Sequence, residues 1–283
     1  MYVENRLPAL VTALLLVAGC VSEAEPMDEL ISDAEQELSS SNALVPNAIN
    51  PNAINPNAIE PSALSMYPLS LSSIGSSSLA AIQDPGSAGE MSRQFLKYAV
   101  SCAFYPIQSF AFSWTDAKGV VHNEVYRGDL GFAPDWAWQR LDVTGQEWVT
   151  ACLAARTNWY GTSVLISMRS VMASTRASAD EIDAYPHEEG AFWGNLFAAT
   201  PFVRACYWTS NVSRSRASYR DCATGHLDSQ SNVQECGPIH IIGACDTYCG
   251  VTQSIDGRHP HCVVDPDVSL TTKTDHVLTV FLP

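Results

Sequence analysis

The distribution of nine cysteines constrains the fold of this 283-residue chain more than any other feature. Cys20 closes an apolar run near the start, and the other eight lie between residues 102 and 262. An even set of cysteines in an exported protein predicts disulfides, here four, although eight cysteines allow roughly 100 pairings. The predicted disulfide set is Cys102, Cys152, Cys206, Cys222, Cys236, Cys245, Cys249 and Cys262.

Residues 1–19 have the organisation of an export signal, with a short polar start, an apolar run from Leu7 to Ala18 and a small residue at its end. The run is too short to cross a bilayer, which takes about 20 residues. The mature chain is therefore expected to be exported and tethered to a membrane rather than to span one. An ordinary cleaved signal peptide, with Cys20 as a spectator, is the alternative.

The residues Val17, Ala18, Gly19 and Cys20 resemble the lipobox of bacterial lipoproteins. This resemblance implies that a peptidase cuts before Cys20 and that the cysteine carries the lipid chains. Two or three chains anchor a protein stably, because each buried CH₂ contributes about 0.8 kcal/mol. Val21 rather than Asp follows the cysteine, and in lipoproteins of two-membrane bacteria this favours the outer membrane.

Composition divides the chain into a signal peptide (1–19), a tether (20–88) and a cysteine-rich globular domain (89–283). The tether is acidic at first, then carries a five-residue repeat from Pro46 to Ser65, and ends rich in serine. Asn before Pro predicts turns in the repeat. We interpret the tether as disordered, with the regular Ala-Ile pairs leaving open a weak docking strip for a partner.

The globular domain is predicted to be a single disulfide-rich α+β domain with two helices and antiparallel strands. Cys102 and Cys152 each lie on the apolar stripe of a predicted helix, so a bridge that pins the two helices together is reasonable. The 210–275 region is loop-rich. Helices are predicted over 90–103 and 145–159, a hairpin over 108–126, and strands over 163–169, 203–209 and 276–282.

A formal net charge of −15 argues against binding of nucleic acid or anionic lipid through charge. The only positive patch is 211–220, which holds three arginines and is best interpreted as a solvated loop, with an anionic glycan as the alternative ligand. The expected partners are the membrane, through the lipid anchor, and a surface glycan or protein. The sequence contains no Gly-rich phosphate loop, and no cofactor is expected.

The stretch 185–197 is the richest in potential chemistry. It supplies a possible ligand site formed by His187, Glu188, Glu189, Trp193 and Asn195. A surface-displayed hydrolase would use this stretch, but no nucleophile motif accompanies it. We favour a buried aromatic turn, with Gly190 and Gly194 permitting close backbone approach.

A zinc site is the alternative use of the last cysteines, because Cys245, Cys249, His259, His261 and Cys262 offer sulfur and nitrogen donors. Their spacing is not a standard two-plus-two arrangement, so no metal is predicted. The layout resembles that of cysteine-rich surface lipoproteins, a likeness that implies no activity. The sequence therefore favours a binding or structural protein over an enzyme.

Overall fold

The computed structural model describes residues 44–45, 48–55, 59–252 and 254–283, all within a compact unit that spans Glu37–Pro283. This unit is an α+β domain, as the sequence predicted. The predicted export signal, Cys20 and the acidic start of the predicted tether lie outside the described residues. Within the described part, no helix combines the length and apolar character that crossing a membrane requires.

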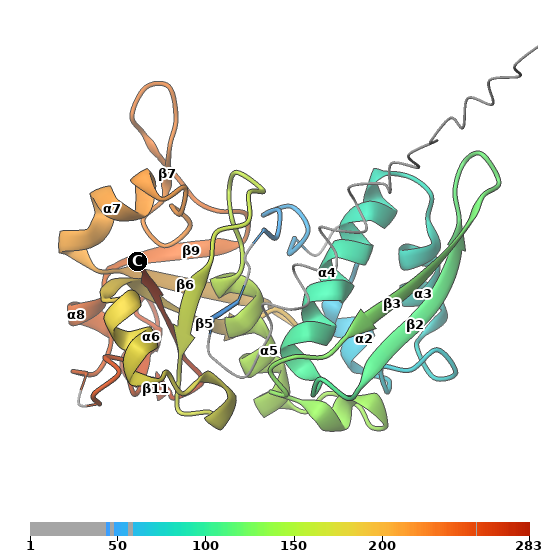
Figure 1. Cartoon of the computed structure of the whole chain (residues 1–283), viewed down its shortest axis with the longest axis horizontal. Coiled ribbons are helices and arrows are strands. Elements are labelled where there is room, and N and C mark those ends of the chain that lie inside the picture. The colour runs from blue at the N-terminus through green and yellow to red at the C-terminus, as the bar shows by residue number, and fades with distance from the viewer. Residues whose placement is uncertain (1–43, 46–47, 56–58, 253) are drawn as a thin grey trace, which may run out of the picture. The chain divides into compact units, whose positions relative to one another are not determined.

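A six-stranded mixed sheet is the central element, with the strand order β1-β4-β12-β5-β6-β9 (Figure 1). Its neighbouring strands are antiparallel except for β6 and β9, which run parallel. The mixed pairing differs from the purely antiparallel arrangement that was predicted. The strands are β1 Leu44–Val45, β4 Ile166–Arg169, β5 His187–Asn195, β6 Phe202–Tyr207, β9 Ile239–Ala244 and β12 Leu278–Leu282.

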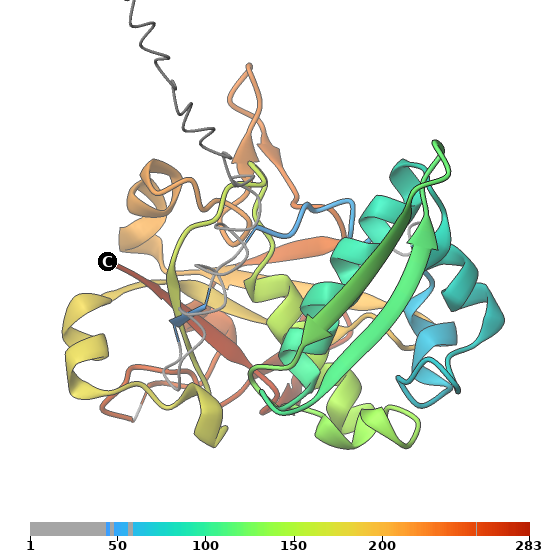
Figure 2. The ribbon, with the colours of Figure 1, turned by 45° about the vertical axis from the view of Figure 1, so that its right-hand side comes forward.

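Helix α5 (Val143–Ala155) packs on β5 of the sheet and also contacts α4 (Ser87–Ala103). The side of α5 away from the sheet carries α3, α4 and the β2–β3 hairpin (Figure 1), and the hairpin lies across α4 (Figure 2). The two predicted helices and the hairpin are thus confirmed, with small shifts at their ends, but the described residues form seven α-helices rather than two. The remaining elements here are α2 Pro61–Ser65, α3 Ser76–Gln83, β2 Ser109–Thr115 and β3 Val121–Arg127.

All eight cysteines after Cys20 are paired, which supports the predicted four disulfides. Cys102–Cys152 joins α4 to α5, as the two apolar stripes suggested. The other three bridges, Cys206–Cys245, Cys222–Cys236 and Cys249–Cys262, link segments of the C-terminal part. Disulfides there restrain a region with few long elements.

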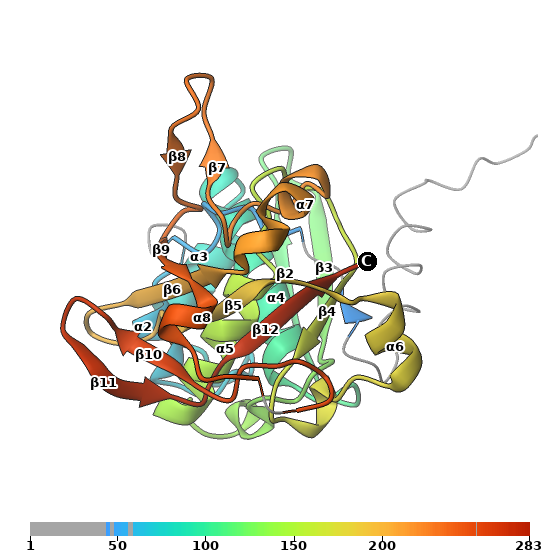
Figure 3. The same ribbon diagram turned by 90° about the vertical axis from the view of Figure 1, so that its left-hand side faces the viewer.

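The C-terminal part consists of short elements, as its loop-rich sequence predicted. Its two small hairpins, β7–β8 and β10–β11, project from the sheet (Figure 3). The short helices and strands are α6 Ala179–Ala184, α7 Val212–Ala217, β7 His226–Leu227, β8 Val233–Gln234, α8 Cys245–Tyr248, β10 Cys262–Asp265 and β11 Ser269–Thr274. Among the described residues, 3₁₀ turns span Pro134–Ala137, which precedes α5, and Ala173–Thr175 and Thr209–Asn211.

The prediction of a disordered tether up to residue 88 is wrong for its second half. The apolar residue of each five-residue repeat is buried in the main core, namely Ile49, Ile54, Ile59 and Leu64. The predicted turn does form, because the amide of Ala53 donates to the carbonyl of Asn50 at 2.8 Å. This turn leads directly into the buried Ala53 and Ile54, and burial of the apolar side chains offsets the ordering cost of the repeat.

The stretch 185–197 is also not an aromatic turn. It forms β5, which pairs with β12 on one edge and β6 on the other. Close backbone approach is nevertheless real at Gly190, where a Cβ atom would lie 2.0 Å from the carbonyl oxygen of Cys206. A strand buried on both faces shows no alternation of polar and apolar residues, and this is why its sequence does not resemble a strand.

Candidate functional site

The possible ligand site predicted on 185–197 does not form one open pocket. His187 is half-buried at the start of β5, and the other four side chains are buried. Trp193 donates its indole N–H to the carbonyl of Val264 at 3.3 Å, and the amide of Asn195 donates to Gln146 at 3.1 Å. Glu188 and Glu189 engage different partners, because adjacent strand residues point to opposite faces.

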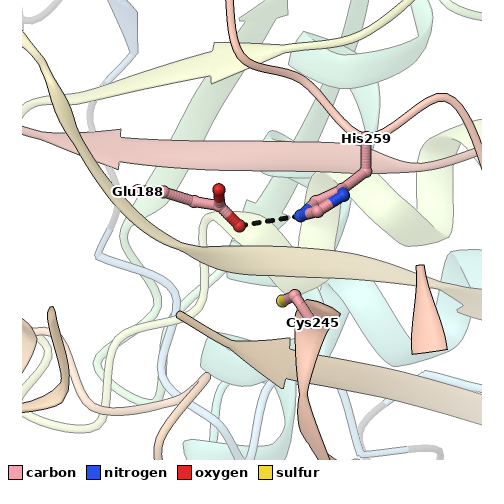
Figure 4. Close-up of side chains that lie close together, drawn as sticks. All are labelled: Glu188, Cys245 and His259. Carbon is pink, nitrogen blue, oxygen red and sulfur yellow. Dashed lines mark hydrogen bonds and ion pairs between the residues drawn. The ribbon is translucent and has the colours of Figure 1, made fainter. Parts of the chain in front are cut away.

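Glu188 binds His259, at 2.8 Å between Oε1 and Nε2, with Cys245 close by (Figure 4). Burial disfavours protonation of His259, but the hydrogen bond and charge of Glu188, with the carbonyl of Gly250, outweigh it and raise its pKa. One ligand atom from each of Glu188, Cys245 and His259 lies within 4.8 Å of the others. The three groups form a buried polar cluster between β5 and the C-terminal loops.

The zinc alternative on 245–262 loses its thiolates in this arrangement. Cys245 pairs with Cys206, and Cys249 pairs with Cys262, so none of these sulfurs is a free anionic ligand. His261 points elsewhere, with Nε2 3.1 Å from Nζ of Lys273. The five predicted donors therefore do not converge on one point.

The arginines of the 211–220 stretch are engaged by the protein itself. Arg214 donates to the carbonyl of Pro283 at 3.1 Å, and Arg216 donates to the carbonyls of Thr224 and Gly225 at 3.3 and 3.4 Å. The stretch contains α7 rather than only a solvated loop. It does not gather three free guanidinium groups for an anionic glycan.

Four ring side chains do gather at the surface: Trp159, Tyr160, Tyr219 and His226. The indole of Trp159 stacks on the imidazole of His226, with centroids 4.3 Å apart and planes 12° apart. Tyr160 meets His226 and Tyr219 edge to face, at 5.6 and 5.3 Å. Trp159, Tyr160 and Tyr219 are 37%, 42% and 59% exposed, and we call the four residues the aromatic face.

Asp221 orients this face from the interior. Its side chain is buried, with Oδ2 2.7 Å from Nδ1 of His226. Burial, followed by the charge of Asp221, raises the pKa of Tyr160. Nδ1 of His226 is engaged by Asp221, whereas no hydrogen bond to its Nε2 is seen among the described residues.

Tyr219 has a left-handed backbone conformation, with φ of +56°, which is rare for a bulky residue. Such strain costs about 1–3 kcal/mol and persists only where the surroundings enforce it. The next residue, Arg220, enforces it. Its guanidinium donates to the carbonyls of Ala155 and Thr157 at 2.9 and 2.7 Å, and pairs with Glu189 at 2.8 Å.

The Arg220 anchor joins the two segments that supply the aromatic face. Ala155 is the last residue of α5 and Thr157 lies two residues beyond it, shortly before Trp159 and Tyr160, whereas Arg220 lies between Tyr219 and Asp221. Burial raises the pKa of Glu189, and the charge of Arg220 opposes this shift. Glu189 thus acts on the aromatic face by holding Arg220 in place, and it is not a ligand-binding carboxylate.

No protein-family model, curated protein or solved structure matches this chain. The aromatic face was not predicted, because the sequence placed Trp159 on the stripe of a helix that in fact ends at Ala155. One local signal was present. Two consecutive aromatic residues precede Gly161, whose φ of +62° places them on a turn rather than on a helix.

Proposed function

We propose that this chain is an exported, lipid-anchored protein that binds carbohydrate on the aromatic face. The observation that carries the proposal is the ring cluster of exposed Trp159, Tyr160 and Tyr219 with half-buried His226. Exposed aromatic rings in contact with one another mark interaction sites rather than ordinary surface. Trp and Tyr combine a flat apolar body with a polar tip, which suits ligands of mixed polarity.

Carbohydrate matches this mixture. A pyranose ring presents C–H groups on its faces and hydroxyl groups around its edge, so it can stack on an aromatic ring while its hydroxyls form hydrogen bonds. The exposed indole of Trp159 offers a stacking surface, and Nε2 of His226 offers a hydrogen-bonding group beside it. The bound arginines of α7 favour a neutral glycan over an anionic one.

The rings are held in place before a ligand arrives. Asp221 fixes His226, and the buried Arg220–Glu189 pair fixes the backbone of Tyr219. Pre-organisation raises affinity because less conformational freedom is lost on binding. A disulfide between Cys222 and Cys236 further restrains the segment that follows Asp221.

Export and anchoring are supported by the lipobox resemblance at Cys20 and by the paired cysteines, which are typical of oxidising compartments. A lipid anchor would display the aromatic face near the cell surface, where polysaccharides are abundant. The function is then retention or recognition of a glycan, without chemical conversion of it.

Binding of the mature full-length chain to an array of neutral and anionic glycans tests this proposal. The informative variant is Trp159→Ala, and the matched control is Trp138→Ala, which removes another exposed tryptophan outside the aromatic face. We expect the wild-type chain and Trp138→Ala to bind the same neutral glycans and Trp159→Ala to lose them. Equal binding by all three proteins, or binding by none, would overturn the proposal.

A further inference from the structure

Two disulfides lie against each other at the end of the sheet. Cys206 of β6 pairs with Cys245 of α8, and Cys249, just after α8, pairs with Cys262 of β10. The sulfur of Cys206 is only 3.6 Å from the sulfur of Cys249, although these two are not bonded to each other. The described residues show no comparable sulfur contact at the other two disulfides.

Access to these sulfurs is unequal. Cys206, Cys245 and Cys262 are completely buried, whereas Cys249 is half-buried and is the member of the four that solvent reaches. Thiol–disulfide exchange requires a thiolate to approach one sulfur of the bond it breaks, so an external thiol meets Cys249 first.

We propose that the two bridges form a thiol–disulfide exchange site, in which reduction of Cys249–Cys262 by an external dithiol is passed inward and releases the sulfur of Cys245. This inference is independent of carbohydrate binding. It rests on the contact between Cys206 and Cys249, on the exposure of Cys249, and on the polar groups that surround Cys245.

The chemistry balances in two stages. In the first, a dithiol thiolate attacks Sγ of Cys249 and expels the thiolate of Cys262. The second thiol of the dithiol then closes the reagent into a cyclic disulfide and expels the thiolate of Cys249. The dithiol is oxidised by two electrons, and the protein bond is reduced by two electrons.

In the second stage, the Cys249 thiolate attacks Sγ of Cys206, forms a Cys206–Cys249 bond and expels the thiolate of Cys245. This stage exchanges one disulfide for another, with no net electron transfer. Cys262 takes up a proton, and Cys245 is the thiolate product.

The leaving sulfur has a suitable environment. Atoms of Cys245, His259 and Glu188 lie within 4.8 Å of one another, and Glu188 holds His259 by a 2.8 Å hydrogen bond (Figure 4). A protonated imidazole beside a cysteine stabilises the thiolate and makes it a better leaving group. The described residues form no such cluster around Cys249, so the exchange favours release at Cys245.

A Cys262→Ser variant tests the exchange without any reductant, because it leaves Cys249 without its partner. The mature full-length chain would be denatured in acid, labelled with a maleimide and mapped by peptide mass spectrometry. We expect the label on Cys245, with a new Cys206–Cys249 bond. A label shared between Cys245 and Cys249 also supports exchange, whereas a label confined to Cys249, or placed on Cys206, would overturn it.

The matched control is Cys236→Ser, which leaves Cys222 free at a bridge with no second disulfide against it. Its label should stay on Cys222.

Limited reduction of the wild-type chain by dithiothreitol gives an answer that does not depend on a variant folding. The first reduced species should carry labels on Cys245 and Cys262. Labels on Cys249 and Cys262, or a native pairing other than the one described, would contradict the inference.

Discussion

Arg220 donates two hydrogen bonds to a single oxygen of Glu189, at 3.0 Å from Nε and 2.8 Å from Nη2, and both side chains are completely buried. Glu189 lies on β5, whereas Arg220 directly follows Tyr219 of the aromatic face. The pair therefore connects the middle of the sheet to the aromatic face. The pair serves to fix the position of the aromatic face rather than to stabilise the fold, because burying an ion pair adds little net stability.

Removing one member of the Arg220–Glu189 pair should lower the free energy of unfolding. Arg220→Met leaves the Glu189 carboxylate buried without a partner, and we expect a loss of about 3–5 kcal/mol in the free energy of unfolding. Urea denaturation without reductant measures it. The double variant Glu189→Leu/Arg220→Met removes both charges and should recover part of the loss. A single variant within about 1 kcal/mol of wild type would contradict this account.

The five-residue repeat should contribute to stability as part of the core. Ile54→Ala removes a completely buried side chain and should lower the free energy of unfolding by about 2–5 kcal/mol. Asn52→Ala, at an exposed position of the same repeat, should change it by no more than about 0.5 kcal/mol. The same urea titration measures both variants, and equal small effects would indicate that the repeat is a tether after all.

Stability should decrease as pH rises through the folded pKa of His259. Glu188 raises that pKa above its unfolded value of about 6.5, despite the opposing effect of burial. The stabilisation from the charged pair is therefore fully present below about pH 6.5 and is lost as His259 deprotonates in the folded state. Unfolding free energies measured from acidic to alkaline pH report this slope.

Glu188→Gln is the control for the pH effect, because it keeps an acceptor oxygen but removes the charge. The slope that His259 contributes should flatten in this variant. His276 contributes with the same sign, since its hydrogen bond with Glu147 raises its pKa, and Glu147→Gln should remove that part separately. An unchanged pH profile in Glu188→Gln would show that the Glu188–His259 pair is not coupled to folding.

The elements with strong local patterns were predictable. Helix 90–103 showed a clear stripe that ends with Cys102, and the hairpin 108–126 alternates around a turn at Gly119, whose φ is +83°. Ile49 and Ile54 were not predicted as core residues, because an Ala-Ile pair that recurs every five residues matches neither helix nor strand periodicity. Only tertiary packing decides whether such residues are buried.

The aromatic face could not be predicted for a different reason. Tyr160 and Tyr219 are far apart in the chain but meet edge to face, and Arg220 joins their two segments by binding the carbonyls of Ala155 and Thr157. The two Glu residues of β5 looked equally suited to ligand binding in the sequence. Their partners, His259 and Arg220, come from segments whose positions depend on the sheet topology.

Anchoring at Cys20 is tested by substitution. Cys20→Ser should abolish incorporation of radiolabelled palmitate and move the protein from the membrane fraction to the soluble exported fraction, because the lipid chains supply the membrane affinity. Cys236→Ser, which removes a cysteine of the domain, should keep the lipid and serves as the control. Labelling that survives in Cys20→Ser would contradict the lipoprotein proposal.

The most direct test of the central claim is the dissociation constant for a glycan that the array selects, measured by calorimetry with wild type, Trp159→Ala and Trp138→Ala. A tryptophan at the centre of a binding site is worth about 2 kcal/mol, so Trp159→Ala should weaken binding roughly 30-fold, while Trp138→Ala should match wild type. Unaltered affinity in Trp159→Ala, with a folded protein, would contradict carbohydrate binding on the aromatic face.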